Sequence, residues 1–336
     1  MSGIAVAYSG VHQAFQLGLA AEELGKLDQF YCSFFAGRGS WGRVLGRALG
    51  TERLMSRQVA GIACGRIAEN PWPWLLHHCR ARLLRPDCND WLLANARFDR
   101  WVSRQLQQRA SSVFIGVETC AAHSFAVAAE CGMIRVLDCP GIPTDFLDGC
   151  AARAAAELGI HHVSRSDSAG MRERKVEELR LADLILVSSP LQAQMLSDLA
   201  RPPRGFRIVP LWADTSFWRP LEMPEPRGTG PLRVLFAGKV SLRKGVPYLM
   251  RAVTLLGQDA TATFIGDIND ELRPLIADTP SNIRLLPSCS KIELRRHYRE
   301  HDVLVLPSLG DAFGFVALEA MCCGLPVIVT ENCGVP

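Results

Sequence analysis

The stretch Asp302–Pro336, DVLVLPSLGDAFGFVALEAMCCGLPVIVTENCGVP, decides the fold. It contains two short apolar runs, Val303–Leu306 and Val327–Thr330. Apolar runs of this length predict buried strands, and the segment Gly314–Cys323 between them predicts a helix. A buried strand, a helix and a second buried strand form half of a parallel α/β unit.

Two acids in this stretch have the spacing of a ligand site. Asp311 lies in the loop after the first run, and Glu319 lies within the predicted helix. Carboxylates at these places face the crevice above the strand ends, where open α/β sheets bind ligands. The loop is rich in glycine, so the N–H groups of Gly314 and Phe315 are expected to point at an anion. The alternative is that Asp311 caps the helix and Glu319 has a local partner.

Composition narrows the class of protein. A chain of 336 residues suggests two domains, and a formal charge of +3 does not imply nucleic-acid binding. The twelve cysteines form no Cys-x-x-Cys pair or Cys/His ligand spacing, which favours buried thiols in a reducing compartment and no metal site. The N-terminus has no basic leader, and no apolar window reaches a membrane span. We therefore expect a cytoplasmic protein, soluble or peripheral at the inner face of the membrane.

Short apolar runs alternate with helical patterns through the first part of the chain. The runs predict strands at Ile4–Ala7, Gln29–Phe34, Val113–Val117, Ile134–Asp138, Leu184–Ser188 and Arg207–Pro210. This alternation predicts a doubly wound parallel sheet. Gly10 follows the first strand and either lets a ligand approach the backbone or forms a tight turn. No GxGxxG follows that strand, which argues against a nicotinamide or flavin site.

A basic region with tryptophans lies between Arg38 and Arg100. Arginines alternate with apolar residues from Arg38 to Arg57, and a Pro-Trp-Pro-Trp segment follows at Pro71–Trp74. Such a surface is expected to lie on an anionic membrane or to hold an acidic acceptor. The alternative is a solvated basic face over an ordinary core.

The best domain boundary is the proline-rich segment Pro220–Pro231, after which the strand pattern restarts at Leu232–Ala237. We therefore predict a first domain at 1–217, a linker at 218–231 and a second domain at 232–336. Both domains are expected to be doubly wound and to face each other across a cleft.

The first strand of the second domain leads into Gly238–Gly245, GKVSLRKG. Lys239 and Lys244 flank this turn, and they are two of only five lysines in an arginine-rich chain. Lysines at the carboxyl edge of a sheet bind phosphate oxygens, and a diphosphate carries about as much charge as two lysines neutralise. The alternative is that the basic residues solvate a surface turn.

This lysine loop, taken with PSLGDAFGFVALEAMCCGLPVIVT, resembles the retaining glycosyltransferase family four, whose members have the GT-B architecture of two Rossmann-like domains. The resemblance extends to Glu178–Pro190, Val209–Pro220 and Phe264–Asp267. It covers the second half of the chain, and the first half by architecture alone. The family has glutamate at Asp311 and glycine at Trp212, and its members continue beyond Pro336, so the chain is expected to be C-terminally truncated.

The resemblance implies a donor site for a nucleotide-diphosphate sugar. It implies that Lys239 and Lys244 bind the diphosphate, that Asp311 lies near the donor sugar, and that Glu319 accepts from the ribose hydroxyls. The expected catalytic residues are Lys239, Lys244 and Asp311, and the expected donor site comprises Gly238, Lys239, Lys244, Gly266, Asp311, Gly314, Phe315 and Glu319. On the first domain, the expected acceptor-side residues are Gly10, His12, Glu118 and His123.

The function implied is transfer of a sugar, with retention, to an acceptor hydroxyl in polysaccharide, cell-envelope or glycolipid biosynthesis. The nucleotide sugar is a substrate, the acceptor is a sugar or is lipid-linked, and no cofactor is expected. The chain has no Asp-x-Asp pair for a divalent ion, so a metal-independent reaction is expected. The alternatives are a non-catalytic sugar-nucleotide-binding subunit and a GT-B nucleotide-sugar epimerase.

Overall fold

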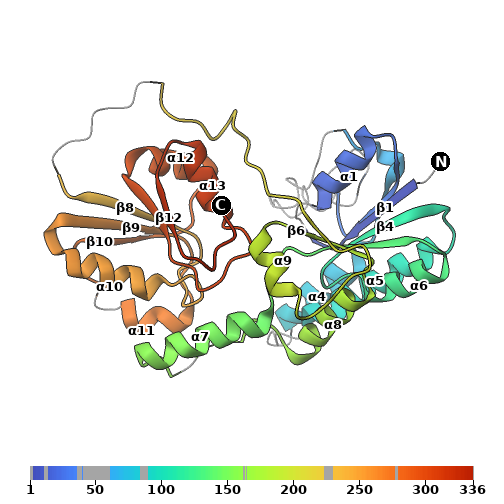
Figure 1. Cartoon of the computed structure of the whole chain (residues 1–336), viewed down its shortest axis with the longest axis horizontal. Coiled ribbons are helices and arrows are strands. Elements are labelled where there is room, and N and C mark those ends of the chain that lie inside the picture. The colour runs from blue at the N-terminus through green and yellow to red at the C-terminus, as the bar shows by residue number, and fades with distance from the viewer. Residues whose placement is uncertain are drawn as a thin grey trace. The chain divides into compact units, whose positions relative to one another are not determined.

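The computed structural model describes residues 3–10, 14–35, 40, 61–83, 90–161, 163, 165–222, 230–276 and 279–335 (Figure 1). His12 and the basic segment 41–57 lie outside the described residues. The chain divides into two compact units. Unit 1 comprises residues 1–140, 167–187 and 197–207, and unit 2 comprises residues 141–166, 188–196 and 208–336.

Unit 1 is built on a seven-stranded sheet in the order β3-β2-β1-β4-β5-β6-β7. Its pairings from β3 to β6 are parallel. The strands are β1 (Gly3–Tyr8), β2 (Leu27–Cys32), β3 (Ile67–Glu69), β4 (Ser111–Val117), β5 (Ile134–Asp138), β6 (Leu184–Val187) and β7 (Phe206–Ile208).

Helices flank this sheet (Figure 1). They are α1 (Ala14–Glu23), α4 (Trp72–Leu83), α5 (Asp90–Leu106), α6 (Ala122–Glu130) and α8 (Ala169–Leu181), with a 3-10 turn at Cys64–Arg66. Aromatic residues fill the space between α1 and the sheet, where the rings of Phe15 and Phe30 lie 4.9 Å apart. The side chain of Phe30 is fully buried.

Unit 2 is built on a five-stranded sheet in the order β10-β9-β8-β11-β12, and all its pairings are parallel. The strands are β8 (Leu232–Ala237), β9 (Ala260–Ile265), β10 (Ile283–Leu286), β11 (Val303–Leu306) and β12 (Val327–Val329). The helices are α7 (Thr144–Leu158), α9 (Pro190–Leu196), α10 (Val246–Leu256), α11 (Arg273–Ile276), α12 (Lys291–Glu300) and α13 (Phe315–Cys322), with 3-10 turns at Gly257–Asp259 and Asp270–Leu272. Figure 1 shows α10 and α11 on one side of this sheet and α12 and α13 on the other.

Each sheet contains an arginine–aspartate ion pair that joins two neighbouring strands. In unit 1, Arg135 on β5 contacts Asp183, the residue before β6, at 2.6 Å, and its backbone N–H donates to the same carboxylate. In unit 2, Arg233 on β8 contacts Asp302, the residue before β11, at 2.8 Å, again with a backbone N–H bond. Each pair joins neighbouring strands near their amino ends and stabilises the register of those two strands. The loops described below lie at the opposite, carboxyl edge of the sheet.

The two parallel sheets with flanking helices confirm the predicted α/β class. The units differ from the predicted bounds 1–217 and 232–336 in the segments 141–166, 188–196 and 208–217. Helix α7 lies in unit 2 because Ala151, Ala154 and Ala155 pack into the core built on β8. Among the described helices, none combines the length and apolar character needed to cross a membrane.

Candidate functional site

Four loops of unit 2 converge at the carboxyl edge of its sheet. Lys239 follows β8, Gly266 follows β9, Ser288 follows β10 and Asp311 follows β11. The central strand β8 pairs with both β9 and β11. The loop that carries Lys239 therefore lies between the loops that carry Gly266 and Asp311. Of the residues predicted for the donor side, Gly238, Lys239, Gly266 and Asp311 thus lie on loops at one edge of one sheet.

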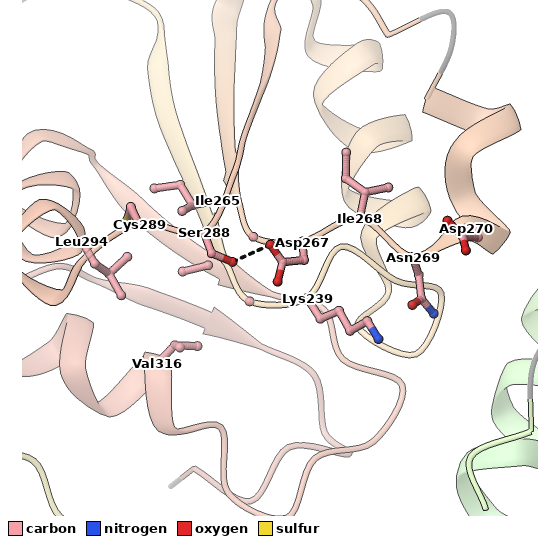
Figure 2. A pocket seen from close by; sticks show the side chains of 13 residues that line it. Lys239, Ile265, Asp267, Ile268, Asn269, Asp270, Ser288, Cys289, Leu294 and Val316 are labelled. Atoms are coloured by element: carbon pink, nitrogen blue, oxygen red, sulfur yellow. Dashed lines mark hydrogen bonds between the residues drawn. The ribbon is translucent and has the colours of Figure 1, made fainter. Parts of the chain in front are cut away.

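A pocket of about 540 Å³ opens among these loops (Figure 2). This volume falls within the range of small-molecule sites. Figure 2 shows an apolar end with Leu294 and Val316 and an end carrying the amine of Lys239 and the amide of Asn269. Its lining residues are Ala237, Gly238, Lys239, Ile265, Gly266, Asp267, Ile268, Asn269, Asp270, Ser288, Cys289, Leu294 and Val316.

Between these two ends, the hydroxyl of Ser288 donates to the carboxylate of Asp267 at 2.8 Å (Figure 2). A ligand in this pocket would therefore meet apolar side chains at one end, the Ser288 hydroxyl and the Asp267 carboxylate in the middle, and the side chains of Lys239, Asn269 and Asp270 at the other end.

Two glycines let the β8 and β9 loops touch. Gly266 has φ +150°, and a Cβ on it would lie 1.9 Å from the carbonyl oxygen of Gly238. The N–H of Gly238 in turn donates to the carbonyl of Ile265 at 2.9 Å. A side chain at Gly266 would therefore separate the two strands at the wall of the pocket.

The second predicted lysine is paired with the first predicted acid. Nζ of Lys244 lies 2.5 Å from Oδ2 of Asp311. The backbone holds this pair in place, because the N–H of Asp311 donates to the carbonyl of Asn332 at 2.9 Å and the N–H of Leu309 donates to that of Arg243 at 2.8 Å. The alternative in which Asp311 caps the helix is not what the structure shows.

The helix cap is instead Gly314, which has φ +85° and ψ +55° and makes no side-chain cap bond. A Cβ on Gly314 would lie 2.5 Å from Sγ of Cys333. Helix α13 begins at Phe315, which is 41% exposed. The first-turn N–H groups of a helix have no partner within it, so this end is suited to an anion.

The second predicted acid, Glu319, lies on the buried side of α13. It accepts a hydrogen bond from the hydroxyl of Tyr298 on α12 at 3.2 Å. Its side chain is 5% exposed, and burial raises its pKa, while the Tyr298 hydroxyl and the charge of Lys291 lower it. The local-partner alternative for Glu319 is thus seen in the structure, and one carboxylate oxygen carries the bond to Tyr298.

We expect Glu319→Gln to be more stable than the wild type at about pH 8, because the raised pKa means that the folded state disfavours the charged form. The amide oxygen of glutamine still accepts from Tyr298. The wild type loses stability as pH rises through this raised pKa, so the gain of the variant should vanish near the ordinary glutamate pKa of about 4.5. Melting temperatures of both proteins across this range check the prediction, and a gain that grows at acid pH would contradict it.

Two serines that the sequence assigned to no site hold the loop after β11. The hydroxyl of Ser189 donates to the carbonyl of Ala312 at 2.7 Å, and the hydroxyl of Ser188 lies 3.1 Å from the same oxygen. The buried amide of Gln192 accepts from the N–H of Ser188 at 2.7 Å. The start of α9, predicted to belong to the first domain, thus fixes the residue next to Asp311. The resemblance covered both serines but gave them no role.

Ser189→Ala should lower the free energy of unfolding by about 2 kcal/mol. The substitution removes a donor to Ala312 and an acceptor for the N–H of Gln192 at 3.1 Å, both buried. Ser216→Ala is the control, since its hydroxyl donates to Asp214 at the surface, and a change within about 0.5 kcal/mol is expected. Urea unfolding measures both variants, and equal midpoints for Ser189→Ala and the wild type would contradict the role given to Ser189.

In unit 1, the predicted acceptor-side residues lie at the carboxyl edge of neighbouring strands. Gly10 follows β1 and Glu118 follows β4, and these strands pair in parallel. The two loops are in contact, because the hydroxyl of Ser9 lies 3.1 Å from Sγ of Cys120. The structure therefore places Gly10 and Glu118 at one edge.

Glu118 and His123 both have partners within unit 1. Oε2 of Glu118 lies 3.5 Å from Nζ of Lys175, which also contacts Asp167 at 2.8 Å. Nε2 of His123 accepts from Nε of Arg100 at 3.0 Å. His123 thus lies at the start of α6, with its ring held by a neighbouring side chain.

A buried network of charged side chains lies next to this edge, and it was not predicted from the sequence. Glu178, fully buried, accepts from the N–H groups of Thr119 at 2.5 Å and Ala121 at 2.8 Å, and lies 3.1 Å from Nε of Arg174. Arg174 also contacts the buried Asp99 at 2.5 Å. Thr119 has φ +78°, a conformation that costs a threonine energy. The network holds the β4–α6 turn, and the only hint of it in the sequence is the i,i+4 spacing of Arg174 and Glu178.

The chain is similar to known proteins in the part that carries this pocket. Residues 231–336, which hold the pocket and the Lys244–Asp311 pair, match the family described as Glycosyl transferases group 1. A D-inositol 3-phosphate glycosyltransferase from Pseudarthrobacter chlorophenolicus is 32% identical over 180 residues, which cover 48% of this chain and 43% of that protein. The chain thus spans less than half the length of this relative.

Solved structures resemble the chain over almost its whole length. Sucrose-phosphate synthase from Thermosynechococcus elongatus has a TM-score of 0.64 at 15% identity, over 99% of this chain and 82% of that one. Anabaena HepE in complex with UDP has a TM-score of 0.59 at 14% identity, with the same coverage. These likenesses show that the fold is the GT-B fold of two Rossmann-like parallel-sheet units, as predicted. The family matched over residues 231–336 is one of glycosyltransferases.

Proposed function

We propose that the chain is a retaining glycosyltransferase that moves a hexose from a nucleotide-diphosphate donor to an acceptor hydroxyl. The observation that carries the proposal is the pocket of about 540 Å³ in unit 2, because Lys239 lines it and Lys244, on the same loop, pairs with Asp311. The structurally similar HepE was solved in complex with UDP, which supports a nucleotide donor here.

The donor fits the pocket by chemical type. The apolar end with Leu294 and Val316 suits the flat face of a base, and the end with Lys239 suits a phosphate. We assign the ribose hydroxyls to Glu319, whose carboxylate has acceptor sites left after the bond to Tyr298.

The difficult step is departure of the diphosphate from an oxocarbenium-like sugar carbon. Fixed positive charges near the leaving oxygens stabilise that transition state, and they need no reorganisation when the bond breaks. We assign this role to Lys239, to Lys244 and to the N–H groups at the start of α13 near Gly314 and Phe315. Asp311 holds the amine of Lys244 and lies where the donor sugar is expected.

These cations support a metal-independent reaction, so we expect turnover to be unchanged in EDTA. We assign the acceptor, a sugar or a lipid-linked sugar, to unit 1 near Gly10, His12, Glu118 and His123, and the pathway to polysaccharide, cell-envelope or glycolipid biosynthesis. None of the eleven cysteines among the described residues is in a disulfide bond, which supports a cytoplasmic location.

A donor assay tests the proposal. Purified protein is incubated with a panel of nucleotide sugars, with and without sugar acceptors, and the released nucleoside diphosphate is measured. The proposal predicts release from one donor that increases with acceptor. Tight binding without release would favour a non-catalytic subunit, and a changed sugar released without acceptor would favour an epimerase.

A further inference from the structure

Two neighbouring helices of unit 1 carry exposed apolar and basic side chains side by side. On α4 these are Trp72, Leu76 and Arg80, and on α5 they are Leu93, Arg97 and Arg104. We call these six side chains the α4–α5 surface. Trp72 is 62% exposed, Leu76 46% and Leu93 36%. Three large apolar side chains therefore face solvent, where the surface of a soluble domain usually carries polar side chains.

The spacing places each set on one face of its helix. Trp72, Leu76 and Arg80 are four residues apart, and four-residue steps return to the same side of a helix. On α5, Leu93, Arg97 and Arg104 recur at helical spacing on the exposed face, whereas Phe98 and Val102 are fully buried and face the core. The exposure is therefore a property of whole helix faces.

The two faces form one surface. A shallow hollow between the helices is lined from α4 by Pro73, His77 and Arg80 and from α5 by Leu93, Ala94 and Arg97. The ring centroids of His77 on α4 and Trp91 on α5 lie 3.9 Å apart, so side chains of the two helices are in contact. Arg80, Leu93 and Arg97 thus line the same hollow, and Trp72 and Leu76 lie on the same face of α4 as Arg80.

The charge of this surface is one-sided. Helix α4 has no acidic residue, and of the two acids in α5, Asp90 is the first residue of the helix and Asp99 is fully buried. Within the described part of the chain, Arg80, Arg97 and Arg104 form no ion pair. Three arginines without acidic partners there, set among an exposed tryptophan and two leucines, match the pattern of helices that lie in a membrane interface.

We propose that the α4–α5 surface binds the face of an anionic phospholipid bilayer. Trp72, Leu76 and Leu93 enter the interface between headgroups and acyl chains. The arginines contact headgroup phosphates, and their long stems cover apolar surface while the guanidinium groups stay at phosphate level. This binding goes beyond the proposed transfer, because it needs neither donor nor acceptor. The basic region expected from the sequence between Arg38 and Arg100 contains α4 and most of α5, while its segment 41–57 lies outside the described residues.

The test measures sedimentation of the full chain with vesicles, without any nucleotide sugar. Vesicles of phosphatidylglycerol and phosphatidylcholine in equal parts should retain the wild type, whereas pure phosphatidylcholine should retain it weakly. R80Q/R97Q should bind the anionic vesicles about 30-fold more weakly. W72S/L76S should weaken binding about 10-fold, including at raised salt, where the charge contribution is screened.

The control is R201Q/R207Q, which removes two exposed arginines at and before the edge strand β7 and should bind as the wild type does. Melting temperatures within about 2 °C of the wild type show that each variant is folded. Equal binding to anionic and neutral vesicles, or tight binding by R80Q/R97Q, would overturn the proposal. Failure of nucleotide-sugar turnover would leave vesicle binding unchanged, so this proposal and the proposed function fail separately.

Discussion

Lys244→Ala is expected to lower kcat/KM for the donor at least 10-fold. Nζ of Lys244 is held 2.5 Å from Asp311 on the loop after β11, where the proposed diphosphate leaves. Loss of one charge-assisted contact in the transition state removes about 1.4 kcal/mol or more, which is one decade in rate. Steady-state kinetics with the donor found in the panel assay measure the effect.

Two comparisons sharpen this test. Lys26→Ala removes the same charge from an exposed position in unit 1 and should leave kcat/KM unchanged. Since Lys244 and Asp311 form one pair, K244A/D311N should lose much less than the product of the two single losses. A kcat/KM equal to that of the wild type in Lys244→Ala would contradict the role proposed for Lys244 in the mechanism.

Gly245→Ala is expected to lower the free energy of unfolding by about 3 kcal/mol or more. Gly245 has φ +67°, and a Cβ on it would lie 1.8 Å from the carbonyl oxygen of Pro307. The left-handed conformation alone costs alanine about 1–2 kcal/mol, and the overlap must be relieved by moving α10 or the loop that carries Asp311. Activity should therefore fall together with stability, because these loops hold the proposed diphosphate site.

The matched control is Gly159→Ala at the end of α7. Gly159 has φ +70° and ψ +28°, close to the φ +67° and ψ +15° of Gly245, but nothing lies within 4 Å of its added Cβ. This variant should lose only about 1 kcal/mol. Urea unfolding compares the two variants, and equal losses would mean that the contact with Pro307 does not restrict position 245.

Much of the fold was predictable because its strands are buried parallel runs. The predicted bounds of β5, β8 and β11 agree with the structure, since each contains a short apolar run. Strand β3 was missed, because three residues, Ile67–Glu69, give no periodicity. The membership of α7 and α9 in unit 2 was also missed. It depends on side-chain packing and on bonds such as Ser189 to Ala312, which no local pattern records.

The site was predictable where backbone geometry sets the residue type. Gly238, Gly266 and Gly314 have positive φ, and a side chain at Gly266 or Gly314 would clash. The sequence did not reveal that Asp311 holds Lys244, since a loop carboxylate has many partners within reach. Nor did it reveal Asp267 and Ser288 in the pocket, because their contact joins the ends of β9 and β10. The roles of all these residues in donor binding stay predictions.

The proposed mechanism depends on binding of a nucleotide-diphosphate sugar in the pocket of unit 2. To test this binding, the full chain is incubated with an equimolar mixture of nucleotide sugars, unbound ligand is removed, and the ligand that remains bound is identified by mass spectrometry. We predict retention of one nucleotide-diphosphate sugar by the wild type and its loss in Lys239→Ala, whose wild-type amine lines the pocket. Retention of no nucleotide by the wild type, or equal retention by Lys239→Ala, would contradict this binding.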